Sequence, residues 1–313
     1  MRIVVALARM AAEPWQQAID EALRALGVAA EIEPWSGRAT AARYALVWQP
    51  PAELFQHERD LRVVFNLGAG VEALLAQTAL PPQLPVVRLV DAGMATVMAE
   101  YVCFAIARIT RGLHRFGGPH AERDWFVDRP RGRRPAVGVL GLGAIGAQIA
   151  ASIAGFGYPV LGWSRTAKSL ASVQSFAGER ALPEFLRASE ILVDVLPLTA
   201  ATRGLLNCER LALLPAGGHL INVGRGGTIV DDDLLALLDA GHIASATLDV
   251  FETEPLPAEH RYWHHARVTV TPHLAGPTPR EPAAQQIAAA IAALERGVEV
   301  AQLAGYVDRQ RGY

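Results

Sequence analysis

Cysteine and long apolar runs are the features that this sequence of 313 residues has least of. Cys103 and Cys208 are its only cysteines and form no CxxC pair, which argues against a disulfide scaffold or a cysteine zinc site. No stretch reaches the roughly 18 uncharged apolar residues that a membrane span requires. The sequence therefore predicts a protein of the reducing cytoplasm without a membrane segment.

Excess charge of one sign is also missing. The chain has 29 Lys and Arg against 31 Asp and Glu, a formal net charge of -2, which argues against a nucleic-acid or anionic membrane surface as its main purpose. Apolar residues make up 51% and charged residues 19%, proportions typical of a globular protein. Because the length lies at the edge of what one hydrophobic core supports, we expect two domains.

Apolar runs of strand length alternate with helical patterns along most of the chain. Many runs are nearly continuous Val, Ile and Leu, the pattern of strands buried on both faces of a parallel sheet. Alternating strands and helices imply right-handed crossovers and a doubly wound α/β architecture. The expected strands are 3–7, 44–48, 63–67, 137–140, 159–163, 191–196, 219–223, 246–250 and 267–270.

Four stretches have the apolar spacing of longer helices: 13–27, 96–113, 147–156 and 281–297. We place a domain boundary before the second of them, which is followed by a polar stretch rich in Gly, Pro and Arg, 116–135. The last helix is rich in alanine, which favours tight packing against a neighbour.

A glycine-rich turn, Gly141-Leu-Gly143-Ala-Ile-Gly146, directly follows an expected strand and opens a helix. In that context GxGxxG indicates a dinucleotide site. Gly141 permits the tight turn, Gly143 lets the backbone approach a pyrophosphate, and Gly146 lets helix and strand pack closely. The helix N-terminus then presents N–H groups and its positive dipole end to the phosphates. The alternative is an ordinary glycine-rich turn.

The end of the following strand selects the dinucleotide, because an NAD site usually carries Asp or Glu there for the ribose hydroxyls. Here the segment reads Trp163-Ser164-Arg165-Thr166, with Lys168 close behind and no carboxylate. A guanidinium matches a 2′-phosphate in a bidentate fork, and Lys168 would add a point charge. The segment predicts NADPH over NADH, unless both cations are merely solvated.

Three later segments each follow an expected strand, and the carboxyl ends of parallel strands are where ligands bind in open α/β sheets. Together they bring a guanidinium, a carboxylate and an imidazole to one sheet edge. No His, Cys, Asp or Glu spacing indicates a metal site. The segments are Asn222-Val-Gly224-Arg225-Gly226-Gly227, Asp249-Val-Phe251-Glu252-Thr-Glu254-Pro255 and Thr271-Pro272-His273-Leu-Ala-Gly276.

The order GxGxxG, GRGG, DVFETEP, TPHLAG resembles the D-isomer-specific 2-hydroxyacid dehydrogenase family. Gln49 departs from the branch of that family that reduces glyoxylate and hydroxypyruvate, where histidine is expected. The similarity spans essentially the whole chain. The segments that resemble this branch are 46–51, 65–71, 88–94, 98–102, 163–165 and 307–313.

The resemblance assigns catalytic roles to Arg225, Glu254 and His273. Arg225 would hold the substrate carboxylate in a bidentate fork and polarise the adjacent carbonyl, a task suited to a planar, permanently charged group. His273 would be the general acid, because its titration range suits proton transfer near neutrality. Glu254 would orient the imidazole and favour its protonated form. The residues alone do not separate Glu254 from Glu252, whereas the family pattern DVFxxEP points to Glu254.

The resemblance also implies ligand contacts. Asp249 matches a position whose carboxylate meets the nicotinamide carboxamide, and the backbone N–H groups of Ala69 and Gly70 can approach a carboxylate. Trp48 would wall the substrate pocket or belong to the core. Expected cofactor contacts are Gly141, Leu142, Gly143, Ala144, Ile145, Gly146, Trp163, Ser164, Arg165, Thr166, Lys168, Leu196, Pro197, Thr199, Val223, Gly224, Arg225, Asp249, His273 and Gly276. Expected substrate contacts are Trp48, Leu67, Gly68, Ala69, Gly70, Arg225 and His273.

At the scale of the chain, the resemblance implies a flavodoxin-like substrate domain (1–97 plus 280–313), a Rossmann cofactor domain (98–279) and a cleft between them for the active site. It also implies a homodimer through the cofactor domain. The expected reaction is NADPH-dependent reduction of glyoxylate to glycolate or of hydroxypyruvate to glycerate. Two alternatives stay open: another 2-hydroxyacid dehydrogenase of the family, and a non-catalytic dinucleotide sensor that retains the same Arg, Glu and His.

Overall fold

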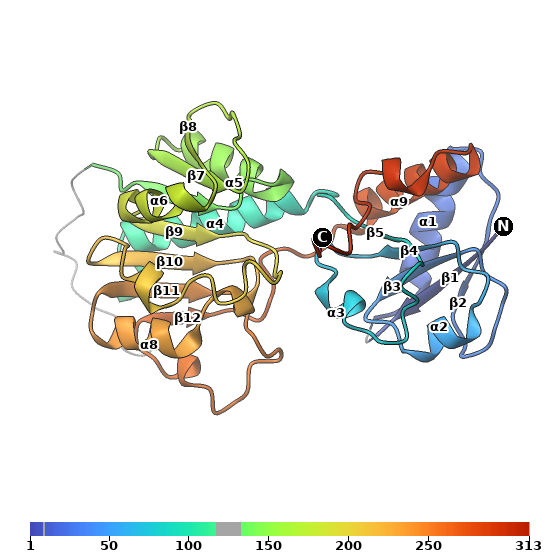
Figure 1. Cartoon of the computed structure of the whole chain (residues 1–313), viewed down its shortest axis with the longest axis horizontal. Coiled ribbons are helices and arrows are strands. Elements are labelled where there is room, and N and C mark those ends of the chain that lie inside the picture. The colour runs from blue at the N-terminus through green and yellow to red at the C-terminus, as the bar shows by residue number, and fades with distance from the viewer. Residues whose placement is uncertain (9, 117–132, 313) are drawn as a thin grey trace. The chain divides into compact units, whose positions relative to one another are not determined.

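The structure is a computed structural model that describes residues 1–8, 10–116 and 133–312 (Figure 1). The chain divides into two compact units: a first unit of Met1–Gly93 with Thr278–Tyr313, and a second unit of Met94–Pro277. The division falls where helix α4 (Met94–Thr110) begins, so a boundary after residue 97 would cut that helix. The polar stretch 116–135 lies almost wholly outside the described residues.

A parallel sheet in the order β2-β1-β3-β4-β5 forms the centre of the first unit. This strand order is that of flavodoxin-like folds. The middle strands are buried along almost their whole length, as their continuous apolar sequences predict. The strands are β1 (Arg2–Leu7), β2 (Glu31–Pro34), β3 (Tyr44–Trp48), β4 (Val63–Asn66) and β5 (Val86–Arg88).

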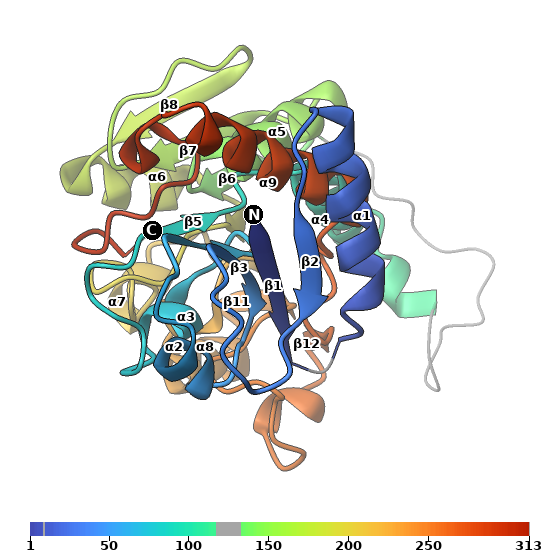
Figure 2. The same cartoon turned by 90° about the vertical axis from the view of Figure 1, so that its right-hand side faces the viewer.

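Helices cover both faces of this sheet. Helix α1 packs along the tail helix α9, and α2 lies across the sheet from them (Figures 1 and 2). The Tyr44 hydroxyl donates to Glu295 Oε1 at 2.7 Å and so joins the end of α9 to β3. The helices of this unit are α1 (Glu13–Ala25), α2 (Glu53–His57), α3 (Glu72–Leu75), α9 (Arg280–Glu295) and the 3₁₀ helix η5 (Val300–Gln302).

The second unit contains a wholly parallel sheet in the order β12-β11-β10-β9-β6-β7-β8. Counted from β6, the first six strands follow the 3-2-1-4-5-6 order of dinucleotide-binding Rossmann folds. The predicted fold class, two doubly wound parallel-sheet domains, is confirmed. The strands are β6 (Val137–Leu140), β7 (Val160–Ser164), β8 (Val173–Ala177), β9 (Ile191–Asp194), β10 (Gly218–Asn222), β11 (Ile243–Leu248) and β12 (Val268–Val270).

Successive side chains along these strands point to opposite faces of the sheet and contribute to two separate hydrophobic cores. Ile191, Val193 and Ile221 point to the core shared with α4 and α5, whereas Leu192 and Leu220 point to the core shared with α6 and α8. Strands covered on both faces therefore need apolar residues at every position. The remaining elements of this unit are α5 (Ala144–Gly155), α6 (Leu182–Ala188), α7 (Cys208–Leu211), α8 (Asp231–Asp239), η1 (Leu113–Phe116), η2 (Glu179–Ala181), η3 (Gly226–Thr228) and η4 (Arg261–Trp263).

Three strands were not predicted from the sequence: β2, β5 and β8. Each lies at an edge of its sheet. An edge strand has one unpaired side and a less buried surface, so its sequence need not be continuously apolar. The sequence of β2, Glu-Ile-Glu-Pro, shows this, and its residues are exposed or half-buried.

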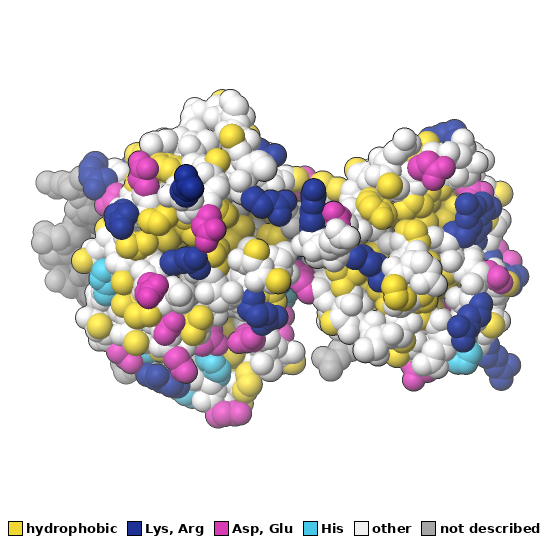
Figure 3. Space-filling view, in the orientation of Figure 1, with side chains coloured by type: hydrophobic (Ala, Val, Ile, Leu, Met, Phe, Trp, Pro, Cys, Tyr) yellow, Lys and Arg dark blue, Asp and Glu magenta, His cyan; other side chains and the backbone are white. Residues whose placement is uncertain are grey.

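Within residues 1–8, 10–116 and 133–312, no helix has both the length and the hydropathy to cross a bilayer. Basic and acidic side chains are interspersed over the visible face of each unit (Figure 3).

Candidate active site

The glycine-rich turn between β6 and α5 has the geometry of a phosphate cradle. Gly141 has φ +111°, a left-handed conformation that favours glycine. A Cβ on Gly143, at the N-terminus of the twelve-residue α5, would meet no atom within 4 Å, so a ligand can reach the backbone there. A Cβ on Gly146 would overlap the Gly141 carbonyl oxygen, which explains the third glycine. These residues fit a dinucleotide pyrophosphate.

The end of β7 is fixed by its own side chains. The Trp163 indole donates to Gly178 O at 2.9 Å, and the buried Ser164 hydroxyl donates to Thr166 O at 2.7 Å. Ser164, one of the expected cofactor contacts, therefore uses its hydroxyl to shape the loop. Arg165 and Lys168 are exposed on this loop, next to the phosphate cradle in sheet order.

The backbone on each side of Arg225 packs closely against another segment of the chain. Arg225 follows β10 in an extended conformation, and a Cβ on Gly224 would come within 2.7 Å of Leu196 O. A Cβ on Gly226 would overlap the backbone of Phe251. The two glycines thus let the Arg225 segment fit between the loop after β9 and the segment after β11. In the structure, Arg225 Nη1 donates to Gly224 O at 2.6 Å.

A polar network that the sequence did not predict holds the backbone of Arg225. Its carbonyl oxygen accepts hydrogen bonds from Asn222 Nδ2 at 3.1 Å and from the Thr228 hydroxyl at 2.7 Å. The same hydroxyl can instead donate to Asp194, which also accepts from Leu196 N at 3.0 Å. Asp194 is fully buried, and this burial raises its pKa to about 6, although both hydrogen bonds oppose the shift. A lone Asp within an apolar run is the sequence signal from which the role of Asp194 could have been predicted.

His273 and Glu254 form a close pair. His273 Nδ1 lies 2.7 Å from Glu254 Oε2, and Glu254 Oε1 accepts from Phe251 N at 2.9 Å. Burial opposes the charged form of Glu254, but the bonds from His273 and Phe251 and the nearby charges of His273 and Arg225 together lower its pKa. Glu252 instead pairs with Arg203 at 3.0 Å. Of the two glutamates, only Glu254 contacts the imidazole.

Asp249 organises the backbone around His273. The carboxylate of Asp249 is 1% exposed and accepts from Leu274 N and Ala275 N, each at 2.9 Å. The backbone carbonyl oxygen of Asp249 accepts a hydrogen bond from His273 N at 2.8 Å. His273 has φ +51°, a left-handed conformation that is uncommon for residues other than glycine. The carboxylate that we expected at the nicotinamide carboxamide is therefore directed at residues 271–275.

The remaining expected cofactor contacts of the second unit lie at the same strand ends. Leu196, Pro197 and Thr199 follow β9, and Thr199 N is held by the Thr202 hydroxyl at 2.8 Å. Val223 follows β10 and is buried. Within the described part of the chain, no cluster of three His, Cys, Asp or Glu side chains could hold a metal.

The expected substrate contacts of the first unit form their own cluster. The Trp48 ring occupies the space where a Cβ on Gly68 would lie, which explains the glycine. The Asn66 amide donates to Gly68 O at 3.0 Å and to Gly70 O at 2.8 Å, so it fixes the turn that contains Ala69. Asn66 was not predicted, although a polar residue that ends an apolar strand is a recognisable signal.

A phosphate cradle and an Arg–Glu–His set on one edge of a Rossmann sheet define a dinucleotide-binding α/β protein of the dehydrogenase class. Residues 104–275 match the family model described as D-isomer specific 2-hydroxyacid dehydrogenase, NAD binding domain. The chain is 42% identical to a glyoxylate/hydroxypyruvate reductase A of Yersinia enterocolitica over 291 residues, 91% of this chain and 92% of that protein.

Solved structures agree with this relation. A D-isomer specific 2-hydroxyacid dehydrogenase from Xanthobacter autotrophicus Py2, in complex with NADPH and MES, is 43% identical with a TM-score of 0.91 and covers 100% of this chain and 99% of that one. An NADPH-dependent glyoxylate/hydroxypyruvate reductase from Sinorhizobium meliloti, in complex with NADP and sulfate, is 33% identical with a TM-score of 0.87 and the same coverage. The chain belongs to the D-isomer specific 2-hydroxyacid dehydrogenase family and is an NAD(P)-dependent enzyme of that class.

Proposed function

We propose that the protein reduces a small 2-oxo acid, glyoxylate or hydroxypyruvate, to the 2-hydroxy acid with NADPH. The observation that carries this proposal is the His273–Glu254 pair, which shares its sheet edge with Arg225 and the phosphate cradle. The names of the relatives from Yersinia enterocolitica and Sinorhizobium meliloti support the same substrate class.

Arg225 is the proposed carboxylate-binding residue. Its guanidinium offers parallel N–H donors that match a carboxylate, and its charge is permanent. Its Nη1 donates to Gly224 O, and a substrate carboxylate would compete for this donor. Bound to the carboxylate, the guanidinium would also lie beside the 2-oxo group and polarise it.

His273 is the proposed general acid. Because Nδ1 faces Glu254, the other ring nitrogen, Nε2, remains to donate a proton to the carbonyl oxygen. The charge of Glu254 stabilises the imidazolium before transfer and fixes the ring plane. The carbonyl oxygen would gain its proton from His273, and the hydride that the carbonyl carbon takes up is the chemistry that NADPH would supply when bound, so that the product is the alcohol.

NADPH is the proposed cofactor because the loop after β7 carries Arg165 and Lys168 where a ribose-binding carboxylate would stand in an NAD site. Both side chains are exposed, as a 2′-phosphate ligand requires. Two relatives whose structures hold NADPH or NADP support this choice.

The first unit is proposed to contribute substrate contacts through Trp48 and the backbone of Leu67, Gly68, Ala69 and Gly70. The Asn66 side chain occupies the carbonyls of Gly68 and Gly70 and so favours a turn whose N–H groups face outward. A cytoplasmic location also remains part of the proposal.

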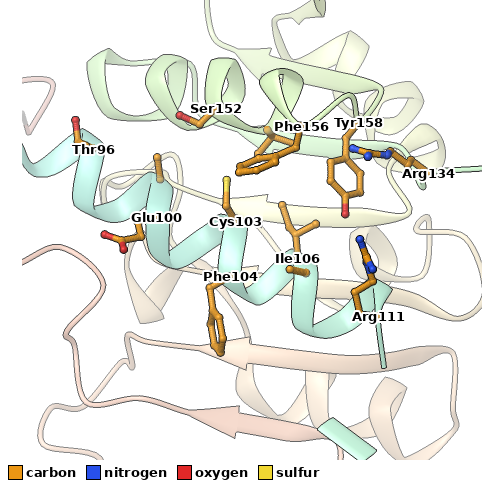
Figure 4. Close-up of a pocket in the computed structure, with 13 residues that line it drawn as sticks. Thr96, Glu100, Cys103, Phe104, Ile106, Arg111, Arg134, Ser152, Phe156 and Tyr158 are labelled. Carbon is orange, nitrogen blue, oxygen red and sulfur yellow. The ribbon is translucent and has the colours of Figure 1, made fainter. Parts of the chain in front are cut away.

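A homodimer through the second unit completes the proposal. Helices α4 and α5 border a pocket of about 580 Å³ whose lining includes the apolar side chains of Cys103 and Ile106 beside several charged ones (Figure 4). Phe104 and Phe156, which also line it, are 62% and 61% exposed. Large exposed aromatic side chains around an apolar hollow are typical of a surface that a partner covers, and we propose a second copy of this chain as that partner.

The first test is loss of absorbance at 340 nm with glyoxylate or hydroxypyruvate, comparing NADPH with NADH. We expect turnover with both substrates and a clear preference for NADPH. NADPH binding without turnover of either acid would contradict the substrate class and favour another oxo acid or a sensor.

Arg165→Ala tests the cofactor assignment. It should weaken NADPH binding by at least about tenfold and leave NADH binding nearly unchanged, because only NADPH carries the 2′-phosphate. Arg187→Ala is the matched control, since Arg187 is also exposed but precedes β9 and so belongs to the opposite sheet edge. Equal losses for both cofactors would exclude Arg165 as the reader of the phosphate.

A further inference from the structure

Two hydrogen bonds join helix α4 to the segment that leads to His273. The Tyr101 hydroxyl lies 2.6 Å from Thr271 Oγ1, and Arg108 Nη1 donates to Thr269 Oγ1 at 2.9 Å. The first of these bonds is extended by another one, because the Thr271 hydroxyl donates to Asp249 Oδ1 at 2.6 Å. Neither Tyr101 nor Thr271 has a part in the proposed chemistry.

The direction of the hydrogens in this chain is determined. A carboxylate only accepts, so Thr271 gives its hydrogen to Asp249 and must accept from Tyr101. Burial first, and the negative charge of Asp249 in addition, raise the pKa of Tyr101, so the phenol remains a donor at neutral pH. The order is Tyr101 O–H to Thr271 O–H to Asp249.

The chain of bonds ends on the residue that shapes the His273 turn. Asp249 accepts hydrogen bonds from both sides of His273: from the Thr271 side chain before it, and from Leu274 N and Ala275 N after it. These bonds oppose relaxation of the left-handed backbone of His273, which holds Nδ1 against Glu254.

We infer that Tyr101 and Thr271 are positioning residues for His273, acting through Asp249 to keep the imidazole in hydrogen-bond register with Glu254. The inference rests on the proposed function for the catalytic consequence, but its structural content is independent of the substrate. A general acid held out of register loses rate, because proton transfer requires hydrogen-bond distance to the substrate oxygen.

Thr271→Val and Thr269→Val form the matched pair of variants. Each replaces one hydroxyl by a methyl group, and each removes one bond to α4, but only Thr271→Val interrupts the path to Asp249. Tyr101→Phe removes a single oxygen from the same path and serves if Thr271→Val does not fold. Thr271→Ser retains the hydroxyl and should restore function.

Steady-state kinetics give the first reading. Thr271→Val and Tyr101→Phe should lower kcat by about tenfold while KM for NADPH stays unchanged, since only the geometry of the acid is altered. Thr269→Val and Thr271→Ser should remain close to wild type. Equal kcat values for the two valine variants would overturn the inference.

The second reading does not need turnover. Long-range ¹H–¹⁵N spectra of the unliganded protein at about pH 9, where imidazoles are neutral, report which ring nitrogen carries the proton. The wild type should show His273 protonated at Nδ1, and Thr271→Val and Tyr101→Phe should populate the other tautomer. His273→Gln identifies the signal. An inactive wild type with this tautomer change would refute the proposed function alone, whereas an active enzyme without it would refute the positioning role alone.

Discussion

At the scale of single residues, one buried carboxyl group carries a pH-dependent cost. Asp194 is fully buried and has no cationic partner among the described residues, and burial raises its pKa to about 6 from an ordinary value of 3.8. As pH rises from about 4, the Asp194 carboxyl group therefore ionises in the unfolded chain before it ionises in the folded protein. The free energy of unfolding therefore falls between about pH 4 and pH 6, by roughly 3 kcal/mol at most, and is constant above that range.

Asp194→Asn should remove this loss. The amide can accept from Leu196 N and donate to the Thr228 hydroxyl, which then donates to Arg225 O. We expect the stability advantage of the variant over wild type to grow between pH 4 and 6 and to remain constant above, with turnover retained. Urea unfolding at pH 4.5 and 7.5 measures it, and an advantage independent of pH would contradict the argument.

His273 and Arg225, the proposed general acid and the proposed carboxylate-binding residue, should differ in their kinetic effects. His273→Ala should lower kcat by about 10²- to 10⁴-fold with a small change in KM, because it removes proton transfer alone. Arg225→Ala should raise KM and lower kcat together, since binding and polarisation are both lost. Steady-state kinetics for the 2-oxo acid separate the two, and near-normal turnover of His273→Ala would remove it from the mechanism.

At the scale of elements, the turn from β6 to α5 shows how similar glycines serve different ends. Gly146 is required by the protein itself, because any Cβ would overlap the Gly141 carbonyl. Gly143 has an ordinary φ of -71° and open space around it, so the fold does not require it. We therefore explain Gly143 by a ligand that approaches the backbone at this position.

Alanine at each position should separate stability from cofactor binding. Gly146→Ala should lower the stability of the unliganded protein by about 1–3 kcal/mol, because backbone must move to relieve the overlap. Gly143→Ala should leave unliganded stability unchanged and weaken NADPH binding by about tenfold or more, since its methyl group would occupy the pyrophosphate position. Thermal unfolding and NADPH titration measure both effects. Unchanged NADPH binding by Gly143→Ala would place the phosphates elsewhere.

At the scale of the whole molecule, the chain leaves its first unit at Gly93 and returns to it at Thr278. The second unit is continuous in sequence and contains every residue of the proposed acid–base machinery. The first unit depends on α9, which packs along α1 and is tied to β3 through Glu295. The alanine-rich sequence of α9 suits this close packing.

The proposed homodimer is tested at this scale. Phe104→Glu should prevent the proposed dimer from forming, because a carboxylate would be desolvated in the proposed interface. Sedimentation equilibrium should then give the 33.5 kDa of a single chain in place of twice that mass. Leu26→Glu, which places the same charge on an exposed apolar residue of the first unit, should remain dimeric. A monomeric wild type would refute the dimer.

Much of the fold was predictable because its signals are local. Continuous apolar runs marked most of the inner strands, and GxGxxG after a strand marked the cradle. The Arg225, Glu254 and His273 segments could be assigned to one sheet edge because parallel strands place their carboxyl ends together. The edge strands β2 and β8 were not predicted because most of their residues are exposed or half-buried, which leaves a weak apolar pattern. Strand β5 is buried at two of its positions but has only three residues, too few for a clear pattern.

The sequence by itself determined the α/β architecture, the glycine-rich turn and the residue types of the proposed active site, because hydrophobic periodicity and glycine spacing act over neighbouring residues. The family pattern already pointed to Glu254, and the tertiary structure shows that Glu254 and not Glu252 meets His273. Tertiary structure alone decided that Asp249 turns toward the His273 backbone. It also joined Tyr101 to Thr271 across 170 residues of sequence. Side-chain direction and long-range pairing depend on how distant elements pack, and no local pattern encodes that.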